Sequence, residues 1–257
     1  MGRVLVERRG SVLLIGLNRP EKRNAADLAM LHELAMAYTT LHTDHELRVG
    51  VVHALGDHFT GGLDLADLGE GLIAGRAELL PPGGIDPWGL TTPPVAKPVV
   101  LAVQGNCLTL GVELVLAADV VIAADSTALA QLEVARGIMA FGGATVRFPR
   151  LGWGDAMRWL LTGDTFGADE ALRIGLVQEV VPHGEQLPRA IEIAERIAAQ
   201  APLAVQATLA NARQALSDPG AATRRLYSTL GMLARTKDAQ RAMGNYLSRQ
   251  PVEFAGE

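Results

Sequence analysis

The chain has 257 residues, 49% of them hydrophobic, which is enough to bury one large core, alone or with a small appended domain. Its 23 basic and 28 acidic residues give a formal net charge of -5, so no basic bias favours nucleic acid or an anionic membrane as a partner. Cys107 is the single cysteine, which excludes an internal disulfide and paired-cysteine zinc sites and suits a reducing compartment.

The sequence shows no segment typical of export or of membrane insertion. The N-terminal run MGRVLVERRG lacks the apolar centre of a secretory signal. The longest apolar stretch, from Lys97 to Asp125, is interrupted by polar residues that include Gln104, Glu113 and Asp119, too many for an ordinary membrane span. We therefore expect a cytoplasmic protein with no membrane partner.

Short runs rich in Val, Ile and Leu alternate with helical patterns along much of the chain. The apolar runs predict strands at Val12–Leu17, Val49–Ala54, Val99–Val103, Val120–Ala123 and Leu176–Val181. Helical spacing predicts helices at Ala26–Leu41, Gly111–Ala117, Asp155–Leu161 and Ala168–Ile174, the last of them ended by Gly175. Continuous apolar strands are typical of a sheet covered on both faces, so the alternation predicts an α/β core.

The segment from Gly69 to Lys97 departs from this alternation. It is rich in glycine and proline, which predicts a long loop without regular elements. Such a loop serves as a lid or binding loop, or is a surface excursion without a role. Trp88 and Leu90 are the residues that favour docking on the core.

The C-terminal part of the chain has a helical pattern without strand signals. It begins at Leu187, and Pro188, Pro202 and Pro219 predict breaks between helices. We expect a core at 1–200 and a helical region at 201–257. Apolar residues at helical spacing, among them Leu226, Tyr227, Leu230 and Met243, give this region a face that packs on its own core or on another subunit.

Two segments share one plan of a strand, a glycine-bearing turn and a helix start. They read VGVVHALGDHFTGGLDLADL from Val49 and VVLAVQGNCLTLGVELVLAAD from Val99. Helix starts expose unpaired N–H groups, so two converging turns would form a pocket for a developing negative oxygen, an oxyanion hole. By itself the plan is common in α/β proteins and carries little weight.

Two acidic residues in apolar surroundings add a chemical pattern. Glu113 lies between Val112 and Leu114 at the expected helix start, and Glu133 lies in LAQLEVARGI. Buried carboxylates in different environments can divide acid and base roles. The structural alternatives are a first-turn helix acid for Glu113 and a surface ion pair with Arg136 for Glu133.

At these residues the sequence resembles the crotonase superfamily, the enoyl-CoA hydratase/isomerase family, over nearly its whole length. The likeness rests on five runs: LNRPEKRNA from Leu17, FTGGLDL from Phe59, QGNCLTLGVEL from Gln104, LTGDTFGADEALRIGLVQEVV from Leu161 and TKDAQRAMGNYLSRQPVEF from Thr236. The resemblance implies an α/β, crotonase-like spiral of ββα units with a helical C-terminal trimerisation region.

The resemblance also implies the site residues. The N–H groups of Leu63 and Leu110 would form the oxyanion hole, and Glu113 and Glu133 would be the catalytic acids. The residues implied to bind the substrate and its coenzyme A are Arg23, Ala25, Gly61, Leu63 and Leu65.

The function implied is that of an enoyl-CoA hydratase, a lyase of fatty acid metabolism that adds water to an α,β-enoyl-CoA thioester. No metal or separate cofactor is expected, since coenzyme A arrives as part of the substrate, and the partners expected are an acyl-CoA and further copies in a homotrimer or homohexamer. Two alternatives remain open: a Δ3,Δ2-enoyl-CoA isomerase that uses Glu133 alone, and a non-catalytic acyl-CoA-binding homologue.

The sequence departs from the family pattern at three places, one of which is Gln131-Leu132-Glu133, where the proline common in the family is missing. Leu108-Thr109-Leu110-Gly111 stands where a glycine cluster is more common, so the Leu110 side chain should narrow the pocket. Phe141 stands where dienoyl-CoA isomerases of the family carry an aspartate, which argues against that reaction.

Overall fold

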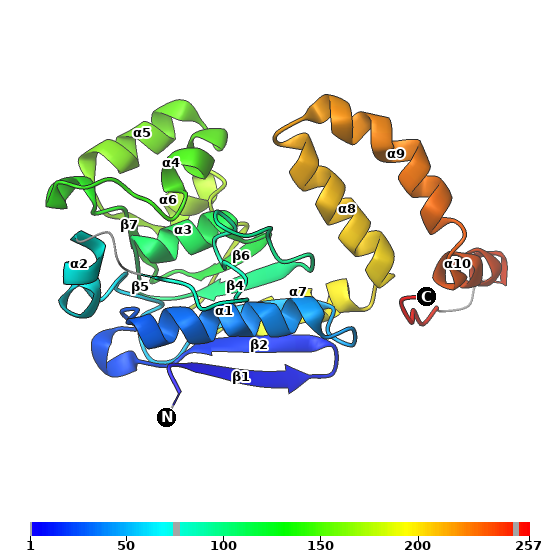
Figure 1. Ribbon diagram of the computed structural model, residues 1–257, viewed down its shortest axis with the longest axis horizontal. Helices are drawn as coiled ribbons and strands as arrows, with labels where there is room; N and C mark the ends of the chain where they lie inside the picture. The colour runs from blue at the N-terminus through cyan, green and yellow to red at the C-terminus, as the bar shows by residue number, and fades with distance from the viewer. Residues whose placement is uncertain (1, 74–77, 249–251) are drawn as a thin grey trace.

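The computed structural model describes residues 2–73, 78–248 and 252–257. A six-stranded sheet forms its centre, and Figure 1 shows the helices around it. The strand order is β1-β2-β3-β4-β6-β9; β1 and β2 pair antiparallel and the other pairs are parallel. The strands are β1 (Val4–Arg9), β2 (Val12–Leu17), β3 (Val49–Ala54), β4 (Val99–Val103), β6 (Val120–Ala124) and β9 (Glu179–Val181). A second, smaller sheet has the order β5-β7-β8, with β5 (Asn106–Leu108), β7 (Ala128–Ala130) and β8 (Phe166–Gly167).

Helices cover both faces of the large sheet. On one face, α1 (Leu28–Thr43) buries Met30, Leu31 and Leu34, and its first turn is capped by Asp27, which accepts a hydrogen bond from the N–H of Met30 at 2.9 Å. On the other face, α7 (Gln186–Ala198) packs through the buried residues Ala190, Ala194 and Ala198, which are four residues apart and lie on one side of the helix. Their small side chains let the helix lie close to the strands. The expected sheet with two covered faces is confirmed.

The remaining helices surround the second sheet or follow the core. The first group comprises α2 (Leu65–Ile73), α3 (Leu110–Ala117), α4 (Ala144–Arg147), α5 (Trp153–Thr162) and α6 (Ala168–Arg173). Three short 3-10 turns are η1 (Pro20–Lys22), η2 (Val134–Arg136) and η3 (Phe148–Arg150). The C-terminal group comprises α8 (Pro202–Ala215), α9 (Pro219–Leu233) and α10 (Lys237–Ser248).

The predicted strands and helices lie where the apolar patterns placed them, with some differences. The strand expected from Leu176 begins at Glu179, and β1 was not predicted because only Val4 of its residues is buried. Pro202 and Pro219 begin helices as expected, but Pro188 breaks nothing, since it lies in the first turn of α7, where no N–H partner is lost.

The predicted loop from Gly69 to Lys97 was partly wrong. Its first residues belong to α2, whereas the described part from residue 78 onward contains no helix or strand. Residues 74–77 lie outside the described residues. Trp88 is buried, as expected for a docked loop, and Leu90 is 43% exposed.

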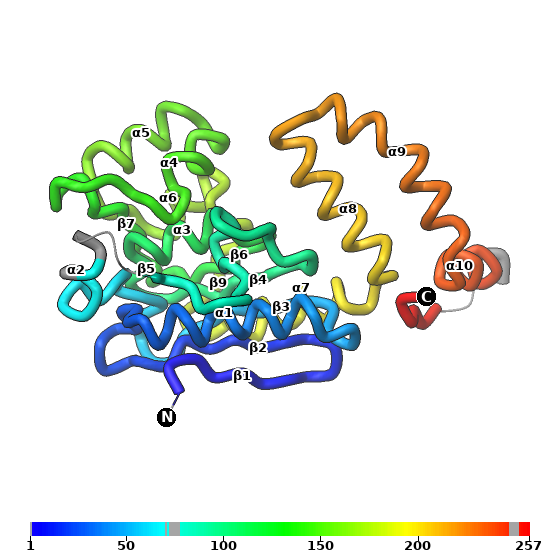
Figure 2. Tube along the Cα trace, viewed as in Figure 1, coloured from blue at the N-terminus to red at the C-terminus, as the bar shows by residue number. Residues whose placement is uncertain are grey.

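The C-terminal helices extend away from the sheet (Figures 1 and 2). Arg213 of α8 links them to the core, since its Nη2 lies 3.0 Å from Asp119 Oδ1 and its Nη1 donates to the Val95 carbonyl at 2.6 Å. The division at residue 200 stays a prediction. Among the helices of the described residues, none is long and apolar enough to cross a membrane.

Candidate active site

The two glycine-bearing turns lie side by side. The N–H of Thr60 donates to the Asn106 carbonyl at 3.0 Å, and the N–H of Leu108 donates to the Thr60 carbonyl at 3.0 Å. His58 adds a side-chain bond, because its Nδ1 accepts from the N–H of Asn106 at 3.1 Å. Backbone bonds therefore join segments that are far apart in the sequence, as the predicted convergence requires.

The N–H groups of Leu63 and Leu110 are both left available by this arrangement. Leu63 forms a parallel bridge with Ala26, whose N–H and carbonyl bond to Gly62 and Asp64, so the N–H of Leu63 points away from Ala26. Leu110 is the first residue of α3, and its N–H precedes the first hydrogen bond of the helix. Both residues line one cavity.

The contact between the two turns constrains Gly62 and Thr109. Gly62 has φ +95°, and a Cβ atom there would overlap Thr109 Oγ1. Thr109 has φ 50° and ψ -113°, a conformation that costs a β-branched residue about 1–3 kcal/mol. Thr109 thus adopts a backbone conformation suited to glycine, which is the physical consequence of the sequence departure noted at this turn.

Glu113 is buried beside the second turn. It lies in the first turn of α3, is 1% exposed, and accepts a hydrogen bond from the N–H of Ala144 at 3.1 Å through Oε1. Burial, helped by the nearby charge of Glu133, raises the pKa of Glu113 to about 7, although the N–H groups of Ala144 and Gly142 act to lower it. A Cβ at Gly142 would overlap Glu113 Oε2, so glycine leaves the room that this carboxyl group needs.

Glu133 is buried as well, at 6% exposure, directly before the turn η2. The β5–β7 pairing brings its segment to the second turn, where the N–H of Thr109 donates to the Ala130 carbonyl at 2.8 Å. Burial raises the pKa of Glu133, while Arg136 acts to lower it. The alternative of a surface ion pair with Arg136 is therefore wrong.

Gln131 holds the Glu133 carboxylate and was not singled out from the sequence as a site residue. It is 1% exposed. With its side-chain nitrogen placed toward the neighbouring acceptors, the amide donates hydrogen bonds to Glu133 Oε2 at 2.9 Å and to the Thr109 carbonyl at 3.2 Å. One amide thus links Glu133 to the second glycine-bearing turn. No local sequence pattern marks this contact.

Glu113 and Glu133 face the same cavity as Leu63 and Leu110, which we call the carboxylate cavity. Its volume is about 20 Å³, which is room for one water molecule between polar groups. The two acids and the two turns, which are separated in sequence, are brought together as the sequence analysis required. Among the described residues, no group of three or more His, Cys, Asp or Glu side chains is arranged to hold a metal ion.

The substrate-binding residues implied by the resemblance lie beside this cavity. Leu65 lines it together with Leu63. Gly61 donates its N–H to the Arg23 carbonyl at 2.8 Å, and a Cβ at Gly61 would contact both Arg23 and Ala25. The Arg23 side chain is exposed.

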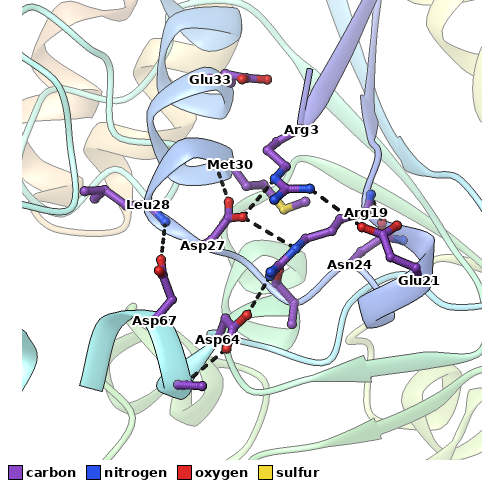
Figure 3. A network of polar contacts seen from close by, with 12 residues as sticks. Arg3, Arg19, Glu21, Asn24, Asp27, Leu28, Met30, Glu33, Asp64 and Asp67 are labelled. Carbon is purple, nitrogen blue, oxygen red and sulfur yellow. Dashed lines mark hydrogen bonds and ion pairs between the residues drawn. The ribbon is translucent and has the colours of Figure 1, made fainter. Parts of the chain in front are cut away.

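A buried ionic network holds the segment that contains Arg23 and Ala25 against the glycine-bearing turn after β3 (Figure 3). Arg19 lies between two carboxylates, with Nη1 2.7 Å from Asp64 Oδ2 and Nε 3.5 Å from Asp27 Oδ2. Asn24 is fully buried and donates to the carbonyls of Leu55 and His58. These residues position the turn without lining the cavity.

The strain at Thr109 generates a stability prediction. Glycine at this position should give a larger free energy of unfolding than alanine, by about 1 kcal/mol, because only alanine keeps the penalty for positive φ. Urea unfolding of Thr109→Gly and Thr109→Ala measures the difference. At an ordinary helical position such as Glu192 the order should be reversed, and an alanine variant more stable than glycine at 109 would contradict the strain.

Comparison with known proteins places this geometry in a family. The family model described as enoyl-CoA hydratase/isomerase matches residues 7–257. The chain is 32% identical over its full length to the full length of 2,3-dehydroadipyl-CoA hydratase from Escherichia coli K12. It is 33% identical to crotonyl-CoA hydratase from Syntrophomonas wolfei, with 98% of this chain and 97% of that protein covered.

Solved structures agree with the fold. A "probable enoyl-CoA hydratase/isomerase" from Mycobacterium abscessus matches with a TM-score of 0.96 and 52% identity, covering 99% of each chain. An enoyl-CoA hydratase from Mycobacterium tuberculosis H37Rv matches with a TM-score of 0.89 and 34% identity over all of both chains. The expected α/β crotonase-like fold is confirmed, and the chain belongs to the enoyl-CoA hydratase/isomerase family.

Proposed function

We propose that the protein adds water to the double bond of an α,β-enoyl-CoA thioester and forms a 3-hydroxyacyl-CoA. The observation that carries this proposal is the presence of two buried glutamates, Glu113 and Glu133, at one cavity with two available N–H groups. The hydratase names of the relatives support the reaction class.

The N–H groups of Leu63 and Leu110 polarise the thioester carbonyl. Two preorganised donors stabilise negative charge that develops on the oxygen, and loss of one such donor typically costs about 3–4 kcal/mol of transition-state stabilisation. Withdrawal of electrons through the conjugated system makes the β-carbon electrophilic. Water then attacks this carbon.

The glutamates move the two protons. Glu113 takes a proton from the attacking water, a role that needs the ionised form, which the N–H groups of Ala144 and Gly142 favour. Glu133 delivers a proton to the α-carbon, a role that needs the protonated form, which its raised pKa favours. Hydroxide is added to the β-carbon and a proton to the α-carbon, and the proton held by Glu113 returns to Glu133 before the next turnover, so that both acids regain their starting forms. This chemistry requires no metal or redox cofactor.

Hydration accounts for both acids better than the alternatives do. Isomerisation of a 3-enoyl thioester shuttles one proton and needs Glu133 alone, and a binding protein needs neither acid. Burial of the Glu113 carboxyl group lowers the stability of the fold, and neither an isomerase that uses Glu133 alone nor a binding protein would need it. Coenzyme A would lie along Arg23, Ala25 and Gly61, next to the first turn.

We also propose that the chain assembles as a homotrimer, or a homohexamer of two trimers, through its C-terminal helices. Tyr227 is 87% exposed, and Leu226 and Leu230 lie on the same face of α9. An exposed apolar face on helices that extend from the core is typical of a subunit interface.

Replacement of either acid should abolish turnover without abolishing binding. We expect Glu113→Gln and Glu133→Gln each to lower kcat for crotonyl-CoA hydration by about 10²–10⁴, because each removes one proton transfer. Loss of absorbance of the conjugated thioester measures the rate, and titration with butanoyl-CoA measures binding. Glu195→Gln, on the exposed face of α7, is the matched control.

Unchanged hydration in either glutamine variant would remove that residue from the mechanism. Retained conversion of a 3-enoyl-CoA in Glu113→Gln, with no hydration by the unaltered protein, would favour the isomerase.

The pH dependence of hydration should report Glu113. Since its pKa is raised to about 7 and the ionised form is the base, kcat/KM should fall as the pH drops below about 7, tenfold per pH unit at the limit. Initial rates between pH 5 and pH 9 at fixed ionic strength test this. An acid limb near the ordinary glutamate value would show that burial does not perturb this group.

The proposed assembly predicts a species of three or six times the chain mass of 27.2 kDa in sedimentation velocity. Leu230→Glu should shift the distribution toward smaller species, because it would bury a charge in the interface. Ser228→Glu, on the opposite face of α9, should not. A monomer at micromolar concentration in the unaltered protein would contradict the assembly.

A further inference from the structure

A turn formed by residues 86–91 separates two cavities. The first, which we call the acyl cavity, has a volume of about 110 Å³ and shares Leu63, Leu110 and Phe141 with the carboxylate cavity. The second, the rear cavity, has a volume of about 480 Å³ and lies beside α8. Asp86 and Trp88 line both, so this turn is the partition between them.

We propose that Trp88 sets the length of the acyl chain that the protein accepts, by closing the acyl cavity against the rear cavity. The inference rests on the proposed function, because it assigns the apolar cavity next to the glutamates to the acyl group. It identifies the substrates as short- and medium-chain thioesters. It also identifies the indole as the feature that excludes longer chains.

The indole is held from the side of the catalytic turn. Trp88 is 7% exposed, and its Nε1–H donates to the Leu110 carbonyl at 3.1 Å. Leu110 also supplies one of the two proposed oxyanion N–H groups. The partition is therefore attached to the same residue that would hold the thioester oxygen.

The backbone of the partition is fixed by Asp86. Its carboxylate, 4% exposed, accepts hydrogen bonds from the N–H groups of Trp88, Leu90 and Thr91 at 2.8–2.9 Å, and from the Thr91 hydroxyl at 2.9 Å. Arg147 of α4 donates through Nη2 to the Trp88 carbonyl at 2.5 Å. This turn lacks regular secondary structure but has little freedom to swing aside.

The size of the acyl cavity limits what fits. A protein cavity of roughly 150 Å³ holds a benzene molecule, so about 110 Å³ has room for about four carbon atoms beyond the carbonyl, α- and β-carbons, which lie at the proposed N–H groups and glutamates. Leu31, Leu79, Leu80 and Leu90 contribute to its lining, which suits a hydrocarbon tail. A longer chain would need the volume that the Trp88 ring occupies.

The rear cavity could accept such a chain once the ring is removed. Its lining includes Val95, Val99, Val115 and Leu176, which offer apolar surface behind Trp88. Arg147 and Arg213 also line it, and Arg213 is paired with Asp119. A hydrocarbon tail would therefore lie along Val95, Val99 and Val115, away from the two arginines.

Two replacements of Trp88 separate its roles. Trp88→Ala removes the ring and should join the two cavities. Trp88→Phe keeps an aromatic partition but loses the hydrogen bond to the Leu110 carbonyl. An effect on chain length that appears only in the alanine variant therefore comes from the lost volume.

The experiment measures binding of saturated butanoyl-, octanoyl-, dodecanoyl- and hexadecanoyl-CoA by calorimetry, which needs no turnover. In the unaltered protein we expect affinity to rise to octanoyl-CoA and to fall at least about tenfold by hexadecanoyl-CoA, as the cavity fills and the tail is left in water. Trp88→Ala should bind hexadecanoyl-CoA at least about tenfold more tightly than the unaltered protein does. Trp88→Phe should keep the unaltered order.

Each outcome decides a different question. Equal affinity of the unaltered protein for octanoyl- and hexadecanoyl-CoA overturns the inference, even if Trp88→Ala does not fold. A folded Trp88→Ala with an unchanged chain-length order overturns it as well, while the proposed function stands. Absence of binding by every thioester would instead overturn the proposed function.

Discussion

The pair of hydrogen bonds between Thr60 and the strand Asn106–Leu108 is the constraint on which the site depends. It joins the turn after β3 to the turn before α3, and it brings Leu63 and Leu110 to one cavity. Neither turn alone would provide two donors for one oxygen. The conformation of Thr109 and the lack of space at Gly62 show how closely the two turns are packed.

The second constraint is the burial of two acids in one small cavity. Isolated carboxylates in such a place would cost several kcal/mol, so each has a donor fixed by another element. Ala144, at the start of α4, donates to Glu113, and Gln131, which follows β7, donates to Glu133. Burial outweighs these donors, so the pKa values of both acids are raised.

The fold, and the presence of several residues at the candidate site, were predictable from the sequence because their signals are local. The apolar runs at Val49–Ala54 and Val99–Val103 are buried strands, and the acid at Glu113 stands out within a hydrophobic segment. Glu133 was harder to place, because Arg136 offers a local partner that the structure does not use as an ion pair. Its apolar surroundings marked it as a candidate, and the resemblance to a family gave it a role.

Other features depend on contacts between distant parts of the chain and leave no local pattern. Gln131 reaches Thr109 only because β5 and β7 pair, and Asn24 reaches His58 only because the turn at Arg23 folds back on the first glycine turn. The role of Trp88 depends on two cavities formed by many elements, so the sequence indicated a docked residue but not a partition.

The central claim is that one thioester oxygen accepts hydrogen bonds from both turns. A crystal structure of the protein with butanoyl-CoA tests it most directly. The account predicts that the thioester oxygen lies within about 3.1 Å of the backbone nitrogens of Leu63 and Leu110, with the α- and β-carbons facing Glu133 and Glu113. A thioester bound with its oxygen away from either nitrogen would contradict it.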